Sequence, residues 1–247
     1  MIRQLMALYD DSLINSGQPE SMFAPTLIFN EGWLLRAVLK EWRAGRGTGT
    51  WNFLPFPEDA RFYSEGQLYT PFGARYQGDK LAEKHSHADG VVGDFSISGS
   101  KSGIRLDASF RYLAVFEAKL SSPLASGTKN AGDYDQVARN VTCMINMILQ
   151  SEPALNYRAY FIVIHPQGSG QVNPDAYGKV VIADQIARRI SAYEGAAGAK
   201  GPAPLFVRQW RSILDAIRIC FLTWEDALLQ IGDPDLSHFY ELCLQFS

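Results

Sequence analysis

The sequence predicts an α/β fold built on a mixed sheet (α+β), formed by a single domain over residues 1–247. Two apolar runs at about 89–97 and 112–120 are typical of strands, and a polar, Gly-rich segment joins them. A third run, "NYRAYFIVIHP" at 156–166, is apolar almost throughout, which is typical of a strand covered on both faces. Segments with apolar residues three and four apart precede, separate and follow these runs, which predicts helices.

Composition favours a soluble, cytoplasmic protein. The chain has 247 residues, of which 47% are hydrophobic, enough for a substantial core. Its formal net charge of -3 gives no overall attraction to nucleic acid or to an anionic membrane, so a nucleic-acid contact would need a local cluster of Lys and Arg. Cys143, Cys220 and Cys243 lack metal-ligand spacing, which predicts reduced, buried thiols. Neither a signal segment nor a membrane-spanning run is found.

The first third of the chain begins with a predicted amphipathic helix at 26–42, with Asn30 as its N-cap and Glu31 in its first turn. The basic, Gly-rich stretch at 43–50 lacks the Walker spacing and is interpreted as a connector. Residues 51–77 are aromatic and rich in Pro and Gly, which predicts loops around one or two short strands. Aromatic side chains here could stack on bases, but ordinary packing is favoured.

The two apolar runs at 89–97 and 112–120 are predicted to form an antiparallel hairpin with a long loop. A helix then starts near Asp133 or Asp135, either of which could cap it, and the buried strand follows. Further expected elements are a helix ending at Gly195, a linker at 195–204, one long helix or two joined helices at 205–232, and a terminal helix capped by Asp235 or Ser237. We therefore expect a core at about 26–166 and a helical extension at about 183–247.

Charged residues at the rims of the hairpin strands form the candidate site. Glu117 and Lys119 project from one face of their strand because they are two residues apart. If Ile97 lies near Tyr112, Lys119 lies opposite residue 89 or 90 and Val115 lies opposite Asp94. This register selects Asp89 as the acid beside Glu117 and leaves Asp94 as the fallback.

Two carboxylates beside a lysine, as in Asp89, Glu117 and Lys119, suit the hydrolysis of phosphodiesters. Mg²⁺ needs hard oxygen ligands and keeps several waters, so one or two carboxylates from adjacent segments suffice. A nearby ammonium can orient the attacking water and stabilise charge that develops on phosphorus.

The stretches "HADGVV" and "VFEAKL" together resemble the Pro-Asp and (D/E)-x-K elements of the PD-(D/E)xK nuclease superfamily, with Ala88 where Pro is common. The resemblance covers about 26–166 and implies a restriction-endonuclease-like core, in the order helix, three-strand meander, helix, strand. Glu31 resembles the additional acid that many members supply from their first core helix. Gln136 resembles the glutamine of the RecB-like subset, whose downstream tyrosine is replaced here by Asn140.

The resemblance implies a nuclease that depends on Mg²⁺ or Mn²⁺. Its metal ligands would be Asp89, Glu117 and Glu31, Lys119 would position water and phosphate, and Gln136 would complete the site. The partner would be nucleic acid, with DNA favoured, and the sequence leaves open RNA, endo or exo action and a homodimer. Two alternatives are a catalytically inactive nuclease-fold protein that binds nucleic acid or a protein, and a metal-dependent hydrolase of small phosphoesters.

Four further residues are weaker candidates for the functional site. His85 and His87 have metal-like spacing but no second His or Cys group nearby, so we interpret them as loop histidines. Arg139 and Lys129 flank the start of the helix after Glu117, where they could contact phosphate or be solvated surface residues.

Overall fold

The computed structural model describes residues 1–15, 24–47, 49–83, 85–98, 103–127, 131–132, 134–168, 170, 172–195 and 202–247. The strands are β1 (Arg61–Leu68), β2 (Ser86–Gly93), β3 (Phe95–Ser98), β4 (Gly103–Leu106), β5 (Tyr112–Ala118), β6 (Arg158–His165) and β7 (Ile217–Thr223). The helices are α1 (Ile2–Asn15), α2 (Glu31–Arg43), α3 (Gln136–Leu149), α4 (Lys179–Glu194), α5 (Pro204–Ala216), α6 (Trp224–Ile231) and α7 (Pro234–Phe246), with short 3₁₀ turns η1 (Pro25–Leu27) and η2 (Pro174–Tyr177). None of these helices is long and apolar enough to cross a membrane.

A mixed sheet forms the centre of the molecule, and in the described residues its strand order is β3-β4-β1-β2-β5-β6-β7. Strands β1, β2 and β5 form an antiparallel meander, and β6 and β7 continue it in parallel with β5. The hairpin β3-β4 lies beyond β1, with β4 parallel to β1 at Gln67. The predicted α/β class with a mixed sheet is confirmed.

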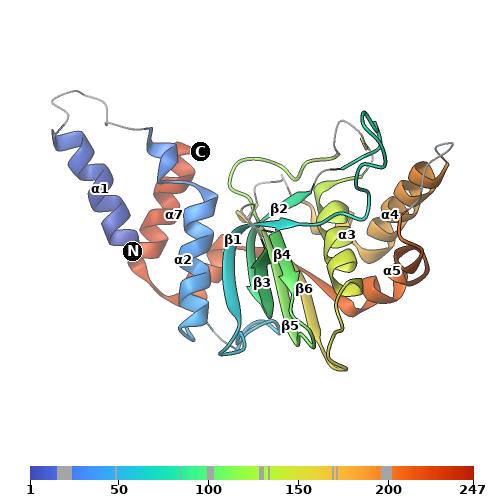
Figure 1. Ribbon diagram of the computed structural model, residues 1–247. Helices are drawn as coiled ribbons and strands as arrows, with labels where there is room; N and C mark the ends of the chain where they lie inside the picture. Colours follow the sequence, from blue (N-terminus) through green and yellow to red (C-terminus); the bar gives the residue numbers. More distant parts are fainter. Residues whose placement is uncertain are drawn as a thin grey trace.

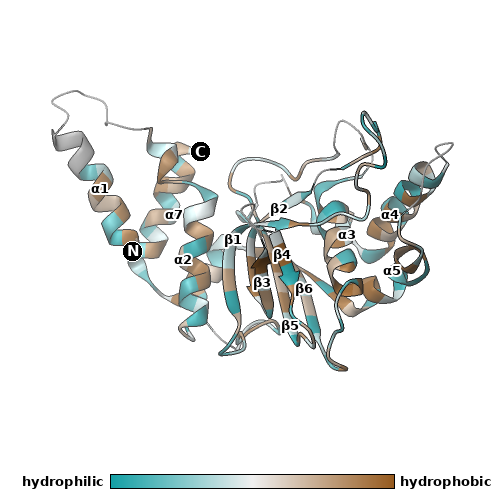
Figure 2. Cartoon of the chain, in the orientation of Figure 1, coloured by the Kyte–Doolittle hydropathy of each residue, from teal (hydrophilic) through white to brown (hydrophobic). Residues whose placement is uncertain are grey.

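Helices cover both faces of the sheet (Figure 1). On one face α2, α6 and α7 pack on residues such as Val92, Ala114 and Phe116. On the other face α3, α4 and α5 pack on residues such as Val91 and Val115. Apolar residues accordingly lie along the strands and on the sheet-facing sides of the helices (Figure 2). The two faces therefore have separate hydrophobic cores, and the alternation along β2 and β5 decides which side chains enter each core.

Several local predictions are confirmed. Asn30 caps α2, since its side chain accepts a hydrogen bond from the Trp33 amide at 3.1 Å. Asp135 caps α3 in the same way through the Ala138 amide, whereas the alternative cap Asp133 lies outside the described residues. Strand β6 is buried along almost its whole length, as the apolar run predicts. Helix α4 ends at Glu194 with Gly195 as its C-cap, and most of the expected linker that follows is not described.

The prediction of one long helix or two joined helices at 205–232 is wrong for the middle of this range, because residues 217–223 form the strand β7 between α5 and α6. This strand pairs in parallel with residues 159–165 of β6, and Thr223 at its end caps α6. The expected helical extension at 183–247 therefore contributes a strand to the sheet. The terminal helix is capped by Asp233, before Pro234, and not by Asp235 or Ser237. Helix α1, which was not expected, packs against α7.

The hairpin register is also corrected. Gly90 pairs with Phe116 and Gly93 with Leu113, so Val115 lies opposite Val91 and not opposite Asp94. The chain leaves β2 at Gly93, where φ is 153° and an added Cβ would lie 2.3 Å from the Tyr112 carbonyl oxygen. The long loop expected between the strands instead contains β4, which pairs with β3. The expected register with Lys119 opposite residue 89 is wrong by two residues, an even shift that leaves each side chain on its expected face, and the one with Val115 opposite Asp94 is wrong by three.

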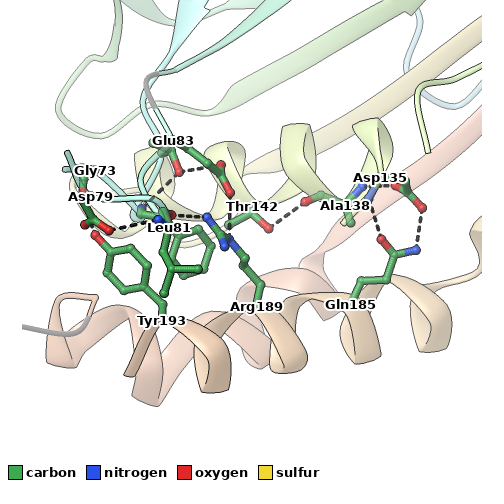
Figure 3. A network of polar contacts seen from close by, with 12 residues as sticks. Gly73, Asp79, Leu81, Glu83, Asp135, Ala138, Thr142, Gln185, Arg189 and Tyr193 are labelled. Carbon is green, nitrogen blue, oxygen red and sulfur yellow. Dashed lines mark hydrogen bonds and ion pairs between the residues drawn. The ribbon is translucent and has the colours of Figure 1, made fainter. Parts of the chain in front are cut away.

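The loop between β1 and β2 is fixed to α4 by buried charges (Figure 3). Arg189 Nε lies 2.9 Å from Glu83 Oε1, and the two side chains are 3% and 6% exposed. Thr70 Oγ1 donates to the other Glu83 oxygen at 3.1 Å, and the Arg189 guanidinium donates to the Leu81 carbonyl. Burial raises the pKa of Glu83, and the charge of Arg189 opposes that rise. Because both charges are buried, the pair holds this loop in one position.

Candidate functional site

Asp89 and Glu117 lie side by side on β2 and β5. The register continues from the Gly90–Phe116 pair, so that the two acids occupy neighbouring positions on the face that carries α3. The amide of Ala118 donates to Asp89 Oδ2 at 2.7 Å, which holds the Asp89 side chain against β5. The structure therefore brings together the two acids that the sequence selected.

Glu117 is 1% exposed and has three polar partners. Lys119 Nζ lies 2.7 Å from Oε1, as expected for two side chains on one face of a strand. Gln136 Nε2 donates to the same oxygen, and Asn140 Nδ2 donates to Oε2 at 3.0 Å. These contacts come from two elements, β5 and α3, and they fix the orientation of the carboxylate.

The two acids are held in an environment that disfavours their charges. Burial raises the pKa of Glu117, although Lys119 and the amide donors oppose the rise. Burial and then the neighbouring charge of Glu117 raise the pKa of Asp89 to about 8, against the Ala118 amide and Lys119. Two carboxylates with raised pKa values beside one ammonium are short of positive charge, and perturbed groups of this kind are concentrated at functional sites.

Glu65 is a charged neighbour that the sequence reasoning missed. It lies on β1 between the Ser64–Gly90 and Gly66–Ala88 pairs, opposite Asp89, with a positive φ of 57° that interrupts the ladder. Its charge contributes to the raised pKa of Asp89. The sequence does contain a signal, since a glycine inside a strand pattern often marks an irregularity. Ser64, one residue earlier, donates through Oγ to the Asp89 carbonyl at 3.2 Å.

The start of α3 is positioned from two directions. Gln136 exchanges hydrogen bonds with Ala125: its amide donates to the Ala125 carbonyl at 2.9 Å, and its Oε1 accepts from the Ala125 amide at 3.2 Å. The cap residue Asp135 is bound by Gln185 of α4, which accepts from the Asp135 amide at 2.8 Å and donates to its carboxylate (Figure 3). Helix α4 therefore helps to fix the position from which Gln136 reaches Glu117.

Two predicted site residues lie apart from this cluster. Within the described residues, Glu31 makes no ion pair with Lys119 and no hydrogen bond with either acid. It occupies the first turn of α2, and its charge contributes to the raised pKa of Cys243 on α7. Asp94 lies beside Tyr112 at the opposite end of β5, where it accepts from the Arg111 amide at 2.7 Å. The fallback assignment of Asp94 is therefore not supported, since about 16 Å of strand separates the two ends.

The weaker candidates are placed as follows. The rings of His85 and His87 meet edge to face with their centroids 5.0 Å apart. Arg139 is partly buried on α3, and its charge acts to lower the pKa of Glu117. Lys129 lies outside the described residues. Among the aromatic residues at 51–77, Phe53 is buried and packs on Trp42 and Phe116, in agreement with the favoured packing role.

The donor set of the site suits a hard cation with few protein ligands. Among the described residues there is no group of three or more His, Cys, Asp and Glu side chains that could hold a metal ion. Asp89 and Glu117 supply two carboxylates, which Mg²⁺ can accept because it retains several waters. The raised pKa values of both acids also fit a bound Mg²⁺, since a divalent cation would supply the missing positive charge.

Comparisons with protein-family models, with curated proteins and with solved structures found no match to this chain.

Proposed function

We propose that the protein is a metal-dependent nuclease that hydrolyses phosphodiester bonds of nucleic acid, with DNA the favoured substrate. The observation that carries the proposal is the ion pair of Glu117 and Lys119 with Asp89 at the neighbouring strand position, where both carboxyl pKa values are raised. The order of α2, the β1-β2-β5 meander, α3 and β6 supports it, because this is the order expected of the PD-(D/E)xK core.

In this proposal Asp89 and Glu117 hold Mg²⁺ or Mn²⁺. When bound, the ion lowers the pKa of a coordinated water and neutralises charge on the phosphate. Glu117 is prepared for this role by Gln136 and Asn140, which donate to its two oxygens and restrict its rotation. Pre-orientation of this kind limits the reorganisation needed when the ligand binds.

In this proposal Lys119 acts on the attacking water and the phosphate. Its ammonium lies 2.7 Å from Glu117 Oε1 and its side chain is 12% exposed, so it can reach a substrate at the surface of the site. The Lys119 backbone is held at both ends, by donation of its amide to the Ile164 carbonyl at 2.9 Å and by acceptance from Trp224 Nε1 at 2.7 Å. We assign to Lys119 the orientation of the attacking water and the stabilisation of the negative charge that develops on the phosphate oxygens.

The test is cleavage of labelled single- and double-stranded DNA and RNA with Mg²⁺ or Mn²⁺, with and without EDTA. Asp89→Asn and Lys119→Ala should each abolish cleavage without loss of folding. Asp184→Asn and Lys80→Ala provide matched controls, since both positions are exposed and lie outside the candidate site. Cleavage that persists in EDTA, or full activity in both site variants, would contradict the proposal.

The alternative is a nuclease-fold protein that binds nucleic acid or a protein partner without turnover. The net charge of -3 favours it, because an acidic protein gains little from general attraction to a polyanion. Calorimetric titration with Mn²⁺ separates the two proposals. A nuclease should bind the ion with an affinity that falls in Glu117→Gln, whereas a binding protein should have no such site.

A further inference from the structure

A pocket of about 270 Å³ lies between the second half of α2 and the start of β1. Its walls are largely apolar and include Leu39 from α2, Phe62 from β1, Val92 from β2 and Phe56 from the preceding loop. Phe56 and Phe62 are only partly buried, so two aromatic rings remain accessible from the pocket. The volume is slightly below the ~300–1,000 Å³ range of pockets for drug-sized ligands, so it suits one ring system.

Three cations of α2 line the same pocket: Arg36, Lys40 and Arg43. They are four and three residues apart, which places them on one helix face at steps of about 6 and 4.5 Å along the axis. Lys40 and Arg43 are exposed, and in the described part of the chain no carboxylate lies within ion-pair distance of either. A protein with net charge -3 thus carries two unpaired cations, Lys40 and Arg43, beside an apolar pocket, whereas Arg36 lies 3.7 Å from Glu65.

The pocket is connected to the candidate site through β1. Arg36 stacks on Trp33 and lies 3.7 Å from Glu65, which is opposite Asp89. Phe62 and Val92 are paired across β1 and β2, and Val92 is three residues, or about 10 Å of strand, from Asp89. Val92 and Asp89 project from opposite faces of β2, so a strand of nucleic acid that contacts the pocket would have to pass around the sheet to reach the acids.

We propose that this pocket binds one nucleotide of a single-stranded nucleic acid, with the base between Phe56 and Phe62 and the flanking phosphates on Lys40 and Arg43. Stacking on aromatic rings is available to every base, and lysine and arginine along a groove bind the backbone. The nucleotide must be unpaired, because a base inside a duplex is stacked and cannot enter a pocket. This inference rests on the proposed function and deepens it by naming single strands, or unpaired ends, as the substrate class.

An anionic lipid is the rival occupant, since an acyl chain would also fill an apolar pocket below a cationic rim. The row of three cations favours nucleic acid, because a lipid carboxylate needs one or two of them, whereas successive phosphates engage several. The limited volume also favours a single base over a long chain.

The test measures binding of fluorescein-labelled oligothymidylate by anisotropy in EDTA, so that cleavage cannot occur. We expect Lys40→Glu/Arg43→Glu to bind at least about tenfold more weakly and to reduce the salt slope by about 1.4, or ~0.7 per lost phosphate contact. Phe62→Leu keeps an apolar group in the pocket but removes the ring, and it should weaken binding with little change in the salt slope. Arg208→Glu/Arg211→Glu on α5 makes the same charge change elsewhere and should bind as the wild type does.

Several results would overturn the inference. The α5 variant could weaken binding as much as the α2 variant does, or the α2 variant could leave binding unchanged. A blunt duplex could bind more tightly than the single strand, or oleate could displace the oligonucleotide at a lower concentration than unlabelled oligothymidylate does. Loss of cleavage with normal binding to the pocket would contradict only the nuclease proposal. Cleavage with binding that does not depend on α2 would contradict only the pocket.

Discussion

Replacement of Asp89 by Asn should stabilise the metal-free protein, and the gain should increase with pH. The folded protein keeps Asp89 protonated to about pH 8, whereas its ordinary pKa is 3.8. Between these values the folded state binds more protons than the unfolded state, so this group makes the free energy of unfolding fall as the pH rises. Asn resembles the protonated acid, does not titrate, and can still accept the hydrogen bond from the Ala118 amide.

The size of the gain follows from the raised pKa. Each unit of pKa corresponds to about 1.4 kcal/mol, so the full difference from the ordinary value would amount to roughly 6 kcal/mol. Asp89 is partly exposed and shares the unfavourable charge with Glu117, so we expect about half of this, or ~3 kcal/mol near pH 8. For a chain of this size that is a rise in Tm of about 6–12 °C. Near pH 4 the gain should be small, because Asp89 is then protonated in the folded state and about half protonated in the unfolded state, and it should vanish at a pH well below 3.8.

The assay is thermal unfolding followed by circular dichroism in EDTA at several pH values between about 4 and 8. Asp184→Asn, at an exposed position of α4, controls for the loss of a carboxylate in general. Added Mn²⁺ should stabilise the wild type near neutral pH but not Asp89→Asn. At a Mn²⁺ concentration of about 100 times Kd, the free energy of unfolding of the wild type should rise by ~2.7 kcal/mol. The reasoning is refuted if Asp89→Asn is no more stable than the wild type near pH 8, or if its gain is the same at every pH.

Three further predictions concern the neighbouring elements. Gln185→Ala should lower the free energy of unfolding by about 1–3 kcal/mol in denaturant titrations, because the substitution leaves the buried Asp135 amide without its acceptor. An unchanged denaturation midpoint would show that water replaces the Gln185 side chain as acceptor. Arg189→Met should cost about 3–5 kcal/mol by leaving the Glu83 carboxylate buried and unpaired. The double variant with Glu83→Gln should recover part of that loss, and strictly additive losses would contradict the pairing. Glu31→Gln should reduce metal-dependent cleavage by less than about tenfold, or ~1.4 kcal/mol, since within the described residues no hydrogen bond or ion pair joins Glu31 to either acid. A complete loss would place Glu31 at the metal.

Local chemistry made parts of the fold predictable. The caps of α2 and α3 depend on a side chain and an amide within three residues of each other. The sequence identifies Asn30 as the first cap and includes Asp135 among two candidates for the second. The projection of Glu117 and Lys119 from one face follows from strand geometry alone, and the structure joins them in an ion pair. The run of apolar residues in β6 is likewise explained by burial on both faces.

Other features depended on partners distant in the chain. Strand β7 follows a helix without a break and has helix-compatible apolar spacing, so only its pairing with β6 distinguishes it from α5 and α6. Glu65 becomes part of the site's electrostatics only because β1 places it opposite Asp89. The two expected registers between β2 and β5 are two and three residues away from the observed one, because the departure of the chain into β3 at Gly93 depends on a close approach to Tyr112.

The sequence by itself determined the cap of α2, the alternation of faces along the strands and the projection of Glu117 and Lys119 from one face, because each depends on geometry within a few residues. The choice of Asp89 also needed an assumed pairing of two strands. Only the tertiary structure decided that Asp89 and Glu117 are adjacent and that the pKa values of both acids are raised. It also decided that Asn140 and Gln136 both donate to Glu117. Burial and strand pairing control these properties, and both are set by contacts between segments far apart in the chain.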